Sequence, residues 1–509
     1  SSDVCSSDLF MQYRIKGYSF VLRYDAFNNS PLLDPQSAYT NHGIGFWQIN
    51  KNIDKLDITM GSFYDQFGTG ILFRAYEQRQ IGIDYAIQGM RLKYNLNDKW
   101  AIKGFAGNQK GNIKNRFGFA NQVISGLNIE GNLGLGADSK YGDLQVGASV
   151  VNRTLDRETM DRLVSTINTY ELADQFYPKY NVYGGNAYLT YTKDNFSWTV
   201  EGNVKSKEAI MEDDSKFHLA GGKVLYTSMS WGKGGWNLGK QTASIGLNVQ
   251  ARHVDHFSFR TAPTENLLNG LVSYLPSMTR QNTYRLLSRY NAPGQAMGED
   301  GIQGEIEFKP RKGTQIFFNG SYVQTLASNG KLNQSTGLKE AEKLFSENYL
   351  EVVQKIGKHN KLKLGIQRIV YNQTRYESEP EYVPVKTITP FGEWLHTMNQ
   401  GKSLRVEWQY LNTKNDQGSF ANLMIEMFVK KNLSVAVADM VNVAPHRYER
   451  MIIANKVLHY PTFFVGYTEK NTVFTLAFLK QQQGVNCSGG ICREEPAFSG
   501  VRFTVSSNF

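Results

Sequence analysis

The sequence has no long apolar run, and this absence excludes a membrane-spanning helix. No stretch approaches the roughly 18 consecutive apolar residues that such a helix needs, and the mean hydropathy is −0.42. Proline is scarce, with 13 in 509 residues, which argues against a disordered chain. The net charge is +10, but lysine and arginine are spread singly. The basic run of a nucleic-acid-binding arm is missing, so no nucleic-acid partner is expected.

Cysteine is also scarce, with three residues in the whole chain. Cys5 lies in SSDVCSSDL (residues 1–9), which repeats Ser-Ser-Asp and resembles the translation of a sequencing adapter. We therefore set residues 1–9 aside as non-native. Cys487 and Cys492 close a short Gly-containing loop, CSGGIC, which predicts a disulfide in an oxidising compartment.

Common catalytic and cofactor motifs are missing as well. GxSxG, HExxH and paired CxxC do not occur. Residues 234–240 have GxxxxGK spacing, but Gln241 stands where a phosphate loop needs Ser or Thr. His253 and His256 are three apart, so on a strand they point to opposite faces. We expect no cofactor, no metal site and no enzymatic activity.

Aromatic residues and period-two alternation are abundant. The chain has 28 Tyr, 29 Phe and 47 Gly, which suits many strands joined by tight turns. In residues 403–410, Leu404, Val406, Trp408 and Tyr410 fall on one face, and Ser403, Arg405, Glu407 and Gln409 fall on the other. Both a half-solvated soluble sheet and a lipid-facing barrel show this alternation.

The connections between the alternating segments are short and long in turn. Short ones include 96–99, 192–195, 309–313, 357–361, 430–432 and 469–471; long ones include 64–86, 154–181, 325–345, 442–458 and 481–496. Outer-membrane barrels have short periplasmic turns and long extracellular loops. The sequence therefore predicts an all-β fold, a large antiparallel transmembrane β-barrel in the outer membrane of a Gram-negative bacterium, with a periplasmic C-terminus.

The same alternation of short and long connections predicts about 22 strands in a single domain, residues 10–509. Residues 257–299 then form one long outer loop, although Gln281–Tyr290 could itself be a strand. Met11–Arg14 reads as the tail of a preceding strand, so we expect an N-terminally truncated barrel with roughly 24 strands when intact. The last strand alternates Val501, Phe503, Val505 and Phe509. It resembles the C-terminal signal that barrels present to the barrel-assembly machinery, which is one expected partner beside outer-membrane lipid and lipopolysaccharide.

Two segments carry a resemblance to a known family. They are GSFYDQFGTGILFRAYEQRQIGIDYAIQGMRLKY (residues 61–94) and the ending CSGGIC…EPAFSGVRF. The chain after residue 10 resembles an uncharacterised family of Bacteroidota outer-membrane β-barrel proteins. This resemblance implies a membrane address and no transferable activity. The usual N-terminal strands of the family are missing here, which puts closure of the barrel in doubt.

Residues 61–94 also supply the candidate site residues: Asp65, Arg74, Glu77, Arg79 and Asp84. One interpretation is a loop that folds over or into the barrel mouth, with these side chains contacting a ligand. The other is that the opposite charges pair among themselves and stiffen the loop. On the strands, Glu201, Glu305 and Glu307 could pair with Lys205 or Arg405 as an interior charge ladder.

Three functions remain open on the sequence. The leading hypothesis is a non-enzymatic barrel that acts as a channel, or as a component or partner of a larger outer-membrane assembly. An energy-coupled importer whose plug was lost by truncation is the first alternative. A barrel-embedded hydrolase with catalytic residues on different strands is the second.

Overall fold

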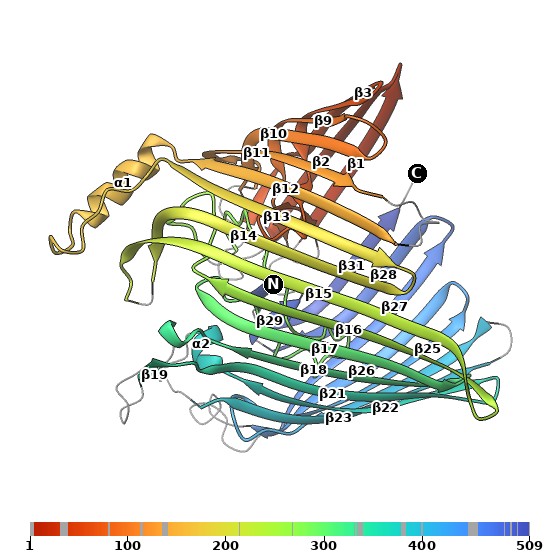
Figure 1. Cartoon of the computed structure of the whole chain (residues 1–509). Helices are drawn as coiled ribbons and strands as arrows, with labels where there is room; N and C mark the ends of the chain where they lie inside the picture. Colours follow the sequence, from red (N-terminus) through yellow and green to blue (C-terminus); the bar gives the residue numbers. More distant parts are fainter. Residues whose placement is uncertain are drawn as a thin grey trace. The chain divides into compact units, whose positions relative to one another are not determined.

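The structure is a computed structural model, and its regular secondary structure is nearly all β-strand (Figure 1). It describes residues 5–30, 39–79, 82–111, 116–134, 141–212, 214–266, 268–329, 331–332, 339–377, 383–398, 401–445, 457–482, 484–488, 491–495 and 497–507. One antiparallel sheet contains 23 strands. The predicted fold class, all-β with a large antiparallel barrel-type sheet, is confirmed.

The strands of the large sheet follow one another along the chain. They are β1 (Cys5–Ile15), β2 (Tyr18–Ser30), β3 (Tyr39–Ile53), β4 (Leu56–Phe63), β9 (Ile87–Asn95), β10 (Trp100–Lys110), β11 (Phe119–Asn132), β12 (Asp143–Thr154), β13 (Asn181–Lys193), β14 (Phe196–Met211), β15 (Phe217–Leu238), β16 (Gln241–Asp255), β17 (Gly298–Arg311), β18 (Thr314–Gln324), β21 (Lys343–Ile356), β22 (Asn360–Tyr371), β23 (Val385–Thr397), β24 (Ser403–Leu411), β25 (Gly418–Lys430), β26 (Leu433–Pro445), β27 (Leu458–Glu469), β28 (Thr472–Gln481) and β31 (Phe498–Ser507).

Short hairpins and helices lie in the connections. The hairpins are β5 (Asp65–Phe67) with β6 (Phe73–Ala75), β7 (Glu77–Gln78) with β8 (Ile83–Asp84), β19 (Lys331–Leu332) with β20 (Lys339–Glu340), and β29 (Gly484–Ser488) with β30 (Ile491–Glu495). The helices are α1 (Arg157–Ile167), α2 (Gln373–Glu377) and the 3-10 helix η2 (Ala327–Asn329). Neither described α-helix is long and apolar enough to span a membrane.

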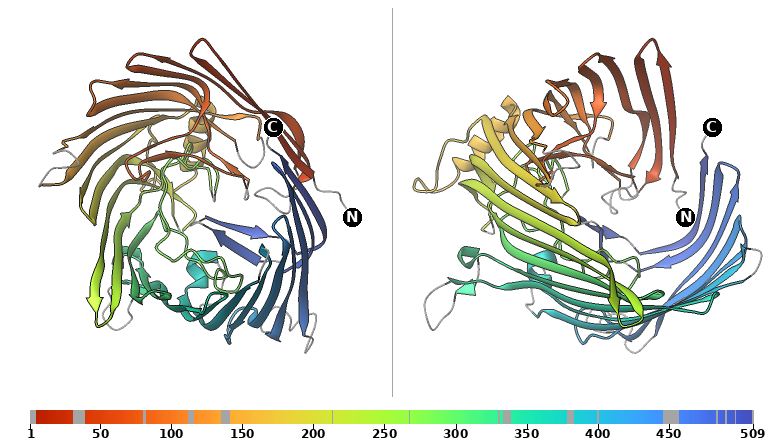
Figure 2. Two further views of the ribbon diagram at one scale, coloured as in Figure 1. Left: turned by 90° about the vertical axis from the view of Figure 1, so that its right-hand side faces the viewer. Right: turned by 45° about the vertical axis from the view of Figure 1, so that its right-hand side comes forward.

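All 22 strands predicted from the alternation are present. The additional strand, β1, contains Met11–Arg14 as expected and pairs with β2. It begins at Cys5, so its backbone includes residues that the sequence analysis set aside. Gln281–Tyr290 is not a strand, which agrees with the alternation of short and long connections. In Figure 2 the chain between β16 and β17 runs as an irregular green trace.

The two faces of the large sheet differ in polarity in the sense expected of a membrane protein. On β24, Trp408 and Tyr410 are each 41% exposed, whereas Glu407 and Gln409 are 5% and 2% exposed. Large apolar side chains thus remain uncovered while their polar neighbours are buried. A soluble sheet buries the apolar face instead.

The chain divides into two compact units. Unit 1 is Ser1–Met229, Ala251–Pro276 and Gly294–Asp300; unit 2 is Ser230–Gln250, Ser277–Pro293 and Gly301–Phe509. Within each unit, irregular segments pack on the polar face of the strands. The long segment after β16 was expected to be an outer loop, but much of it is buried: Phe257, Phe259 and Leu287 are fully covered. Its apolar side chains account for the difference, because exposing them to water costs free energy.

Candidate functional site

The candidate residues lie in the connection between β4 and β9, which we call insert A (residues 64–86). Gly68 and Gly70 have φ values of +56° and +93°, which glycine adopts without strain, and they turn the chain between β5 and β6. Phe67 and Phe73 of the insert contact Phe105 of β10, with ring centroids 5.6 and 4.5 Å apart. This apolar contact anchors insert A to the wall of strands in unit 1.

The neighbouring segment 257–276 covers insert A. Phe257, Phe259 and Val272 belong to the same buried cluster as the insert's aromatic residues. The Arg74 amide donates to the Val272 carbonyl at 3.0 Å, and the Tyr85 hydroxyl donates to the Leu268 carbonyl at 2.5 Å. Insert A is therefore packed on two sides.

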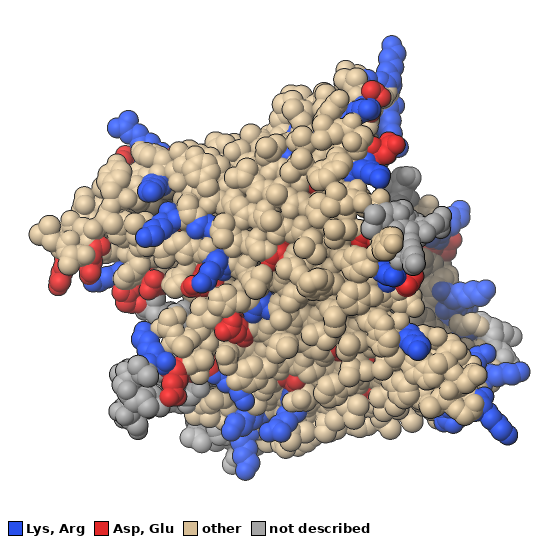
Figure 3. Space-filling view, in the orientation of Figure 1, with Lys and Arg blue, Asp and Glu red and all other residues tan. Residues whose placement is uncertain are grey.

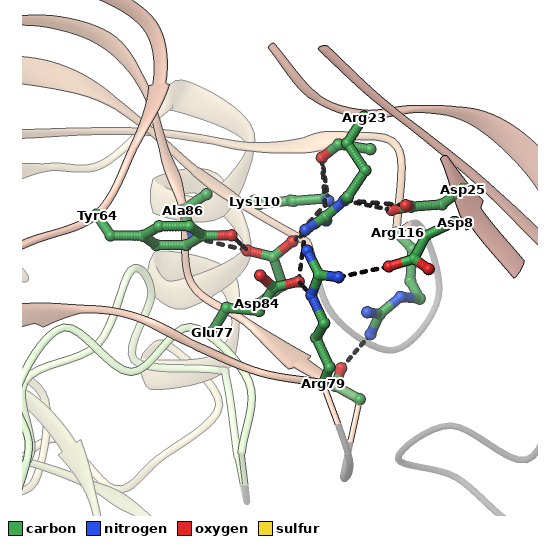
Figure 4. Close-up of polar contacts among 12 residues, drawn as sticks. Asp8, Arg23, Asp25, Tyr64, Glu77, Arg79, Asp84, Ala86, Lys110 and Arg116 are labelled. Carbon is green, nitrogen blue, oxygen red and sulfur yellow. Dashed lines mark hydrogen bonds and ion pairs between the residues drawn. The ribbon is translucent and has the colours of Figure 1, made fainter. Parts of the chain in front are cut away.

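A buried ion-pair network centres on Asp84 (Figure 4). Its carboxylate oxygen Oδ2 lies 2.8 Å from Arg23 Nη2 of β2 and 2.8 Å from Lys110 Nζ of β10. The other oxygen accepts hydrogen bonds from the Tyr64 hydroxyl at 3.0 Å and from the Ala86 amide at 3.2 Å. The Asp84 side chain is fully buried. One carboxylate thus fastens the insert to two strands.

Two further insert residues extend this network. Glu77 Oε1 lies 2.5 Å from Arg23 Nη1 and 3.1 Å from Arg79 Nε. Arg79 also reaches Asp8 of β1 at 2.5 Å. On the strand side, Arg23 Nε lies 2.9 Å from Asp25 Oδ1. Each of these charged groups has an opposite charge beside it within the protein.

Burial and charge oppose each other at Asp84. Burial alone would raise the pKa of Asp84, but Lys110 and Arg23 hold this pKa below its ordinary value. Burial, and then the Asp84 charge, raise the pKa of Tyr64 far above its ordinary value. At neutral pH Asp84 is therefore ionised and Tyr64 keeps its proton, which is the combination that the hydrogen bond between them needs.

The structure brings together only three of the five candidate residues. Asp65 lies in a separate cluster, 2.6 Å from Lys103 Nζ and 3.4 Å from Arg91 Nη1. Arg74 stacks on Tyr76 and Tyr274, with its guanidinium 4.8 and 4.2 Å from the ring centroids. These contacts match the interpretation in which the loop residues find partners within the protein. Ligand contact by these residues stays a prediction.

Sequence reasoning missed the strand residues that complete the network. Arg23, Asp25 and Lys110 lie outside residues 61–94 and carry no motif. The available signal was alternation, since Arg23 and Asp25 share the polar face of β2 and are 2% and 5% exposed. Gly45 on β3 completes the fit, because a Cβ there would lie 1.8 Å from Asp25 Oδ2.

Unit 2 contains a second packed segment, which we call insert B (residues 277–293). The Leu286 amide donates to Gln409 Oε1 at 2.7 Å, and the Tyr284 hydroxyl donates to Glu393 Oε2 at 3.0 Å. The Tyr290 hydroxyl donates to Asp416 Oδ2 at 2.8 Å. Burial, followed by the charge of Asp416, raises the pKa of Tyr290, so this hydroxyl stays protonated.

Apolar residues of insert B reinforce these hydrogen bonds. Met278, Leu286 and Tyr290 join a buried cluster that includes Phe345 of β21 and Phe420 of β25. The ring of Tyr284 packs at a tilt against that of Phe391 of β23, with ring centroids 5.2 Å apart. Insert B therefore covers polar side chains that the strands turn away from their exposed apolar face.

The strand carboxylates Glu201, Glu305 and Glu307 do not pair with Lys205 or Arg405, the partners that the sequence suggested. Glu201 accepts from the Asn186 amide at 2.9 Å and from the Thr69 backbone amide at 2.7 Å. Lys205 pairs with Glu208 instead. In unit 2, Arg405 contacts three carboxylates, with its shortest approaches to Glu407, Glu393 and Glu426 at 2.5, 3.1 and 3.2 Å. Glu305 pairs with Arg280 of insert B, and Glu307 with Lys309.

The structure describes part of the last strand and the loop that contains Cys487 and Cys492. Val501, Phe503 and Val505 alternate along β31 and are exposed; Phe509 lies outside the described residues, and the role of these residues as an assembly signal stays a prediction. Cys487 and Cys492 are directly opposite each other in the β29–β30 hairpin register. The disulfide between them stays a prediction.

Comparison with known proteins shows the family to which the chain belongs. The model of a "Family of unknown function (DUF6029)" matches residues 6–509. A search of curated proteins finds no match. The structure resembles the open form of the ferric-catecholate import receptor Fiu from E. coli K12 (10% identity, TM-score 0.40, 99% of this chain and 79% of the receptor). It also resembles the P pilus usher (PapC) translocation pore (8% identity, TM-score 0.40, 99% of this chain and 96% of the usher). A third similar structure is the copper transporter OprC (9% identity, TM-score 0.39, 99% of this chain and 80% of the transporter). At such scores the functions of these proteins do not transfer.

Proposed function

Because this chain belongs to the DUF6029 family, whose function is unknown, we propose its function from its own structure. It is a non-enzymatic β-barrel of the bacterial outer membrane whose inserts keep it closed to ions. It serves as a component or partner of a larger outer-membrane assembly.

The observation that carries this proposal is the attachment of both inserts to the polar face of the strands. A barrel of 23 strands has an interior too wide for its own side chains to fill, so it is open, plugged or occupied. Insert A is fixed by Asp84 to Arg23 and Lys110. Insert B is fixed by hydrogen bonds to Gln409 and Glu393. Buried attachments of this kind favour the plugged state.

The membrane address is supported by the exposed apolar face. Leu364, Val437 and Leu476 are 46%, 54% and 43% exposed, and each lies well inside its strand. In water such a surface would aggregate, whereas in lipid it is the stable arrangement. Extraction from membranes tests this location directly. We expect the protein to need detergent, and release by carbonate or salt alone would rule out a spanning barrel.

The closed state is tested in planar bilayers with the purified full chain. We expect the wild-type protein to give no stable conductance at neutral pH. A variant in which residues 277–293 are replaced by a Gly-Ser segment of equal length should conduct, because it lacks the contacts of Tyr284, Leu286 and Tyr290. The matched control replaces residues 168–179, which include Leu172 at 89% exposure, and should stay silent. Stable wild-type conductance would refute the closed state and favour an open channel.

A further inference from the structure

The short turns of unit 2 carry a concentration of exposed basic side chains. Four of these turns concern us, β17–β18, β21–β22, β25–β26 and β27–β28, and together we call them the short-turn edge. Their exposed basic residues are Lys309, Arg311, Lys312, Lys355, Lys358, Lys430, Lys431 and Lys470. Blue side chains project along the lower right of the molecule in Figure 3.

Strand pairing places these turns on one edge of the sheet. Antiparallel neighbours pair from β18 through β28 in sequence order, for example Thr314 with Gln354 and Lys430 with Leu433. Every second connection therefore returns to the same edge. The basic residues act as one row rather than as separate points.

Few carboxylates compensate this row. Of the eight basic residues, only Lys309 has a carboxylate within ion-pair distance among the described residues, namely that of Glu307. At the opposite edge of unit 2 the charges are mixed and paired, as for Arg375 and Glu342 at 3.2 Å. The surplus of positive charge thus belongs to one edge.

Exposed apolar side chains lie directly above the lysines. Phe428 and Tyr467 are 38% and 39% exposed on strands that end at Lys430 and Glu469, and Ile356, at 51%, ends β21 next to Lys358. Aromatic rings beside basic groups are typical of a membrane interface, where lysine stems lie along the apolar layer and the ammonium groups reach the headgroups. An acidic protein partner would require the charges but not the adjoining apolar band.

We propose that the short-turn edge of unit 2 binds the phosphate groups of anionic phospholipids in the membrane leaflet that it faces. This inference rests on the proposed membrane-spanning barrel. A basic residue near an anionic membrane surface strengthens association by about fivefold. The row therefore selects anionic over zwitterionic phospholipids around this part of the protein.

The test uses the full chain reconstituted in phosphatidylcholine vesicles that contain a trace of spin-labelled phosphatidylglycerol or spin-labelled phosphatidylcholine. Electron paramagnetic resonance measures the share of each label immobilised at the protein surface. We expect at least a fivefold preference for phosphatidylglycerol in the wild type, reduced by high salt because salt screens exposed charges. The variant Lys312→Gln/Lys358→Gln/Lys431→Gln should lose most of the preference.

The matched control is Lys339→Gln/Lys386→Gln/Lys414→Gln, three exposed lysines at the opposite edge of unit 2. It should keep the wild-type preference. Equal association of both lipids with the wild type would overturn the proposal and leave an acidic protein as the candidate partner. Equal losses in both triple variants would also overturn it. Immobilisation of neither lipid would mean that the chain does not span the bilayer, which is a failure of the proposed function instead.

Discussion

Replacing Asp84 by Asn should release insert A from the strands. The substitution keeps the size of the side chain but removes the charge that faces Arg23 and Lys110, each 2.8 Å away. Arg23 retains Asp25 and Glu77, whereas Asp84 is the only carboxylate within ion-pair distance of Lys110 among the described residues. The Lys110 side chain is 2% exposed, so its charge would remain buried without compensation.

The structure indicates the size of this effect. Removing one partner of a buried ion pair costs about 3–5 kcal/mol. If that cost falls on the docked state of insert A, the equilibrium for its release rises by about 10²- to 4 × 10³-fold. Hydrogen exchange of residues 64–79 and 82–86 in the detergent-solubilised full chain measures this equilibrium. Amides of β5 to β8 should exchange faster by that factor, while those of β21 to β28 should not change.

Two comparisons make the result interpretable. Asp161→Asn removes an exposed partner of Arg157 on α1, where the side chains are 90% and 69% exposed, and should leave exchange unchanged. Adding Lys110→Met to Asp84→Asn removes the uncompensated charge and should restore part of the protection. Wild-type exchange rates in the Asp84→Asn variant would refute the role of the network in holding insert A.

Three further predictions concern the membrane-facing surface, a close contact and pH. Leu364→Arg should cost about 2–4 kcal/mol in folding into lipid vesicles, measured by urea titration, because it puts a charge on the lipid-facing side of β22. Gly45→Ala should cost about 1–3 kcal/mol of unfolding free energy in micelles, since its Cβ would meet Asp25. Planar bilayers that contain the wild-type protein should show no conductance from about pH 5 to pH 9. They should begin to conduct well below pH 3.8, the ordinary pKa of Asp84.

Each of the two substitutions has a control and a contradicting outcome. Leu172→Arg, at an exposed position after α1, should cost nothing, and equal costs at Leu364 and Leu172 would contradict the lipid-facing assignment. Gly202→Ala is the control for Gly45→Ala, because a Cβ there would meet nothing within 4 Å; equal effects would show that crowding is not the cause.

The pH window follows from the directions of the two pKa shifts. The folded-state pKa of Asp84 lies below its ordinary value, so its contribution is present above pH 3.8 and is lost as the pH falls through the folded value. Burial and the Asp84 charge raise the pKa of Tyr64, so its contribution is present below pH 10.0 and is lost only as the pH rises through the raised value. Conductance that appears between pH 5 and pH 9 would contradict the scheme.

The strands were predictable because their signal is local. Alternation such as Leu404, Val406 and Trp408 needs no knowledge of distant partners, and each strand pairs with its neighbour along the chain. The sequences of the two inserts show no such regular alternation of apolar and polar residues. In residues 281–290 the apolar side chains of Leu286, Leu287 and Tyr290 could equally suit a strand, and only their distant partners decide the outcome.

The candidate site was predictable only in part for the same reason. Asp84 and Glu77 were identified from the unusual composition of residues 61–94. Their partner Arg23 lies 61 residues from Asp84 along the chain, and no spacing rule connects the two. Which polar strand residues meet an insert is a property of packing and not of local pattern.

The long sequence separations within insert B have a consequence for the order of assembly. Leu286 and Gln409 are 123 residues apart, and Tyr290 and Asp416 are 126 apart. These partners are synthesised well after insert B, and the cost of closing such long loops must be met before the contacts form. Insert B therefore docks late, after β24 and β25 are in place. Until then its apolar side chains remain uncovered, and exposed apolar surface makes an incompletely folded chain prone to aggregation.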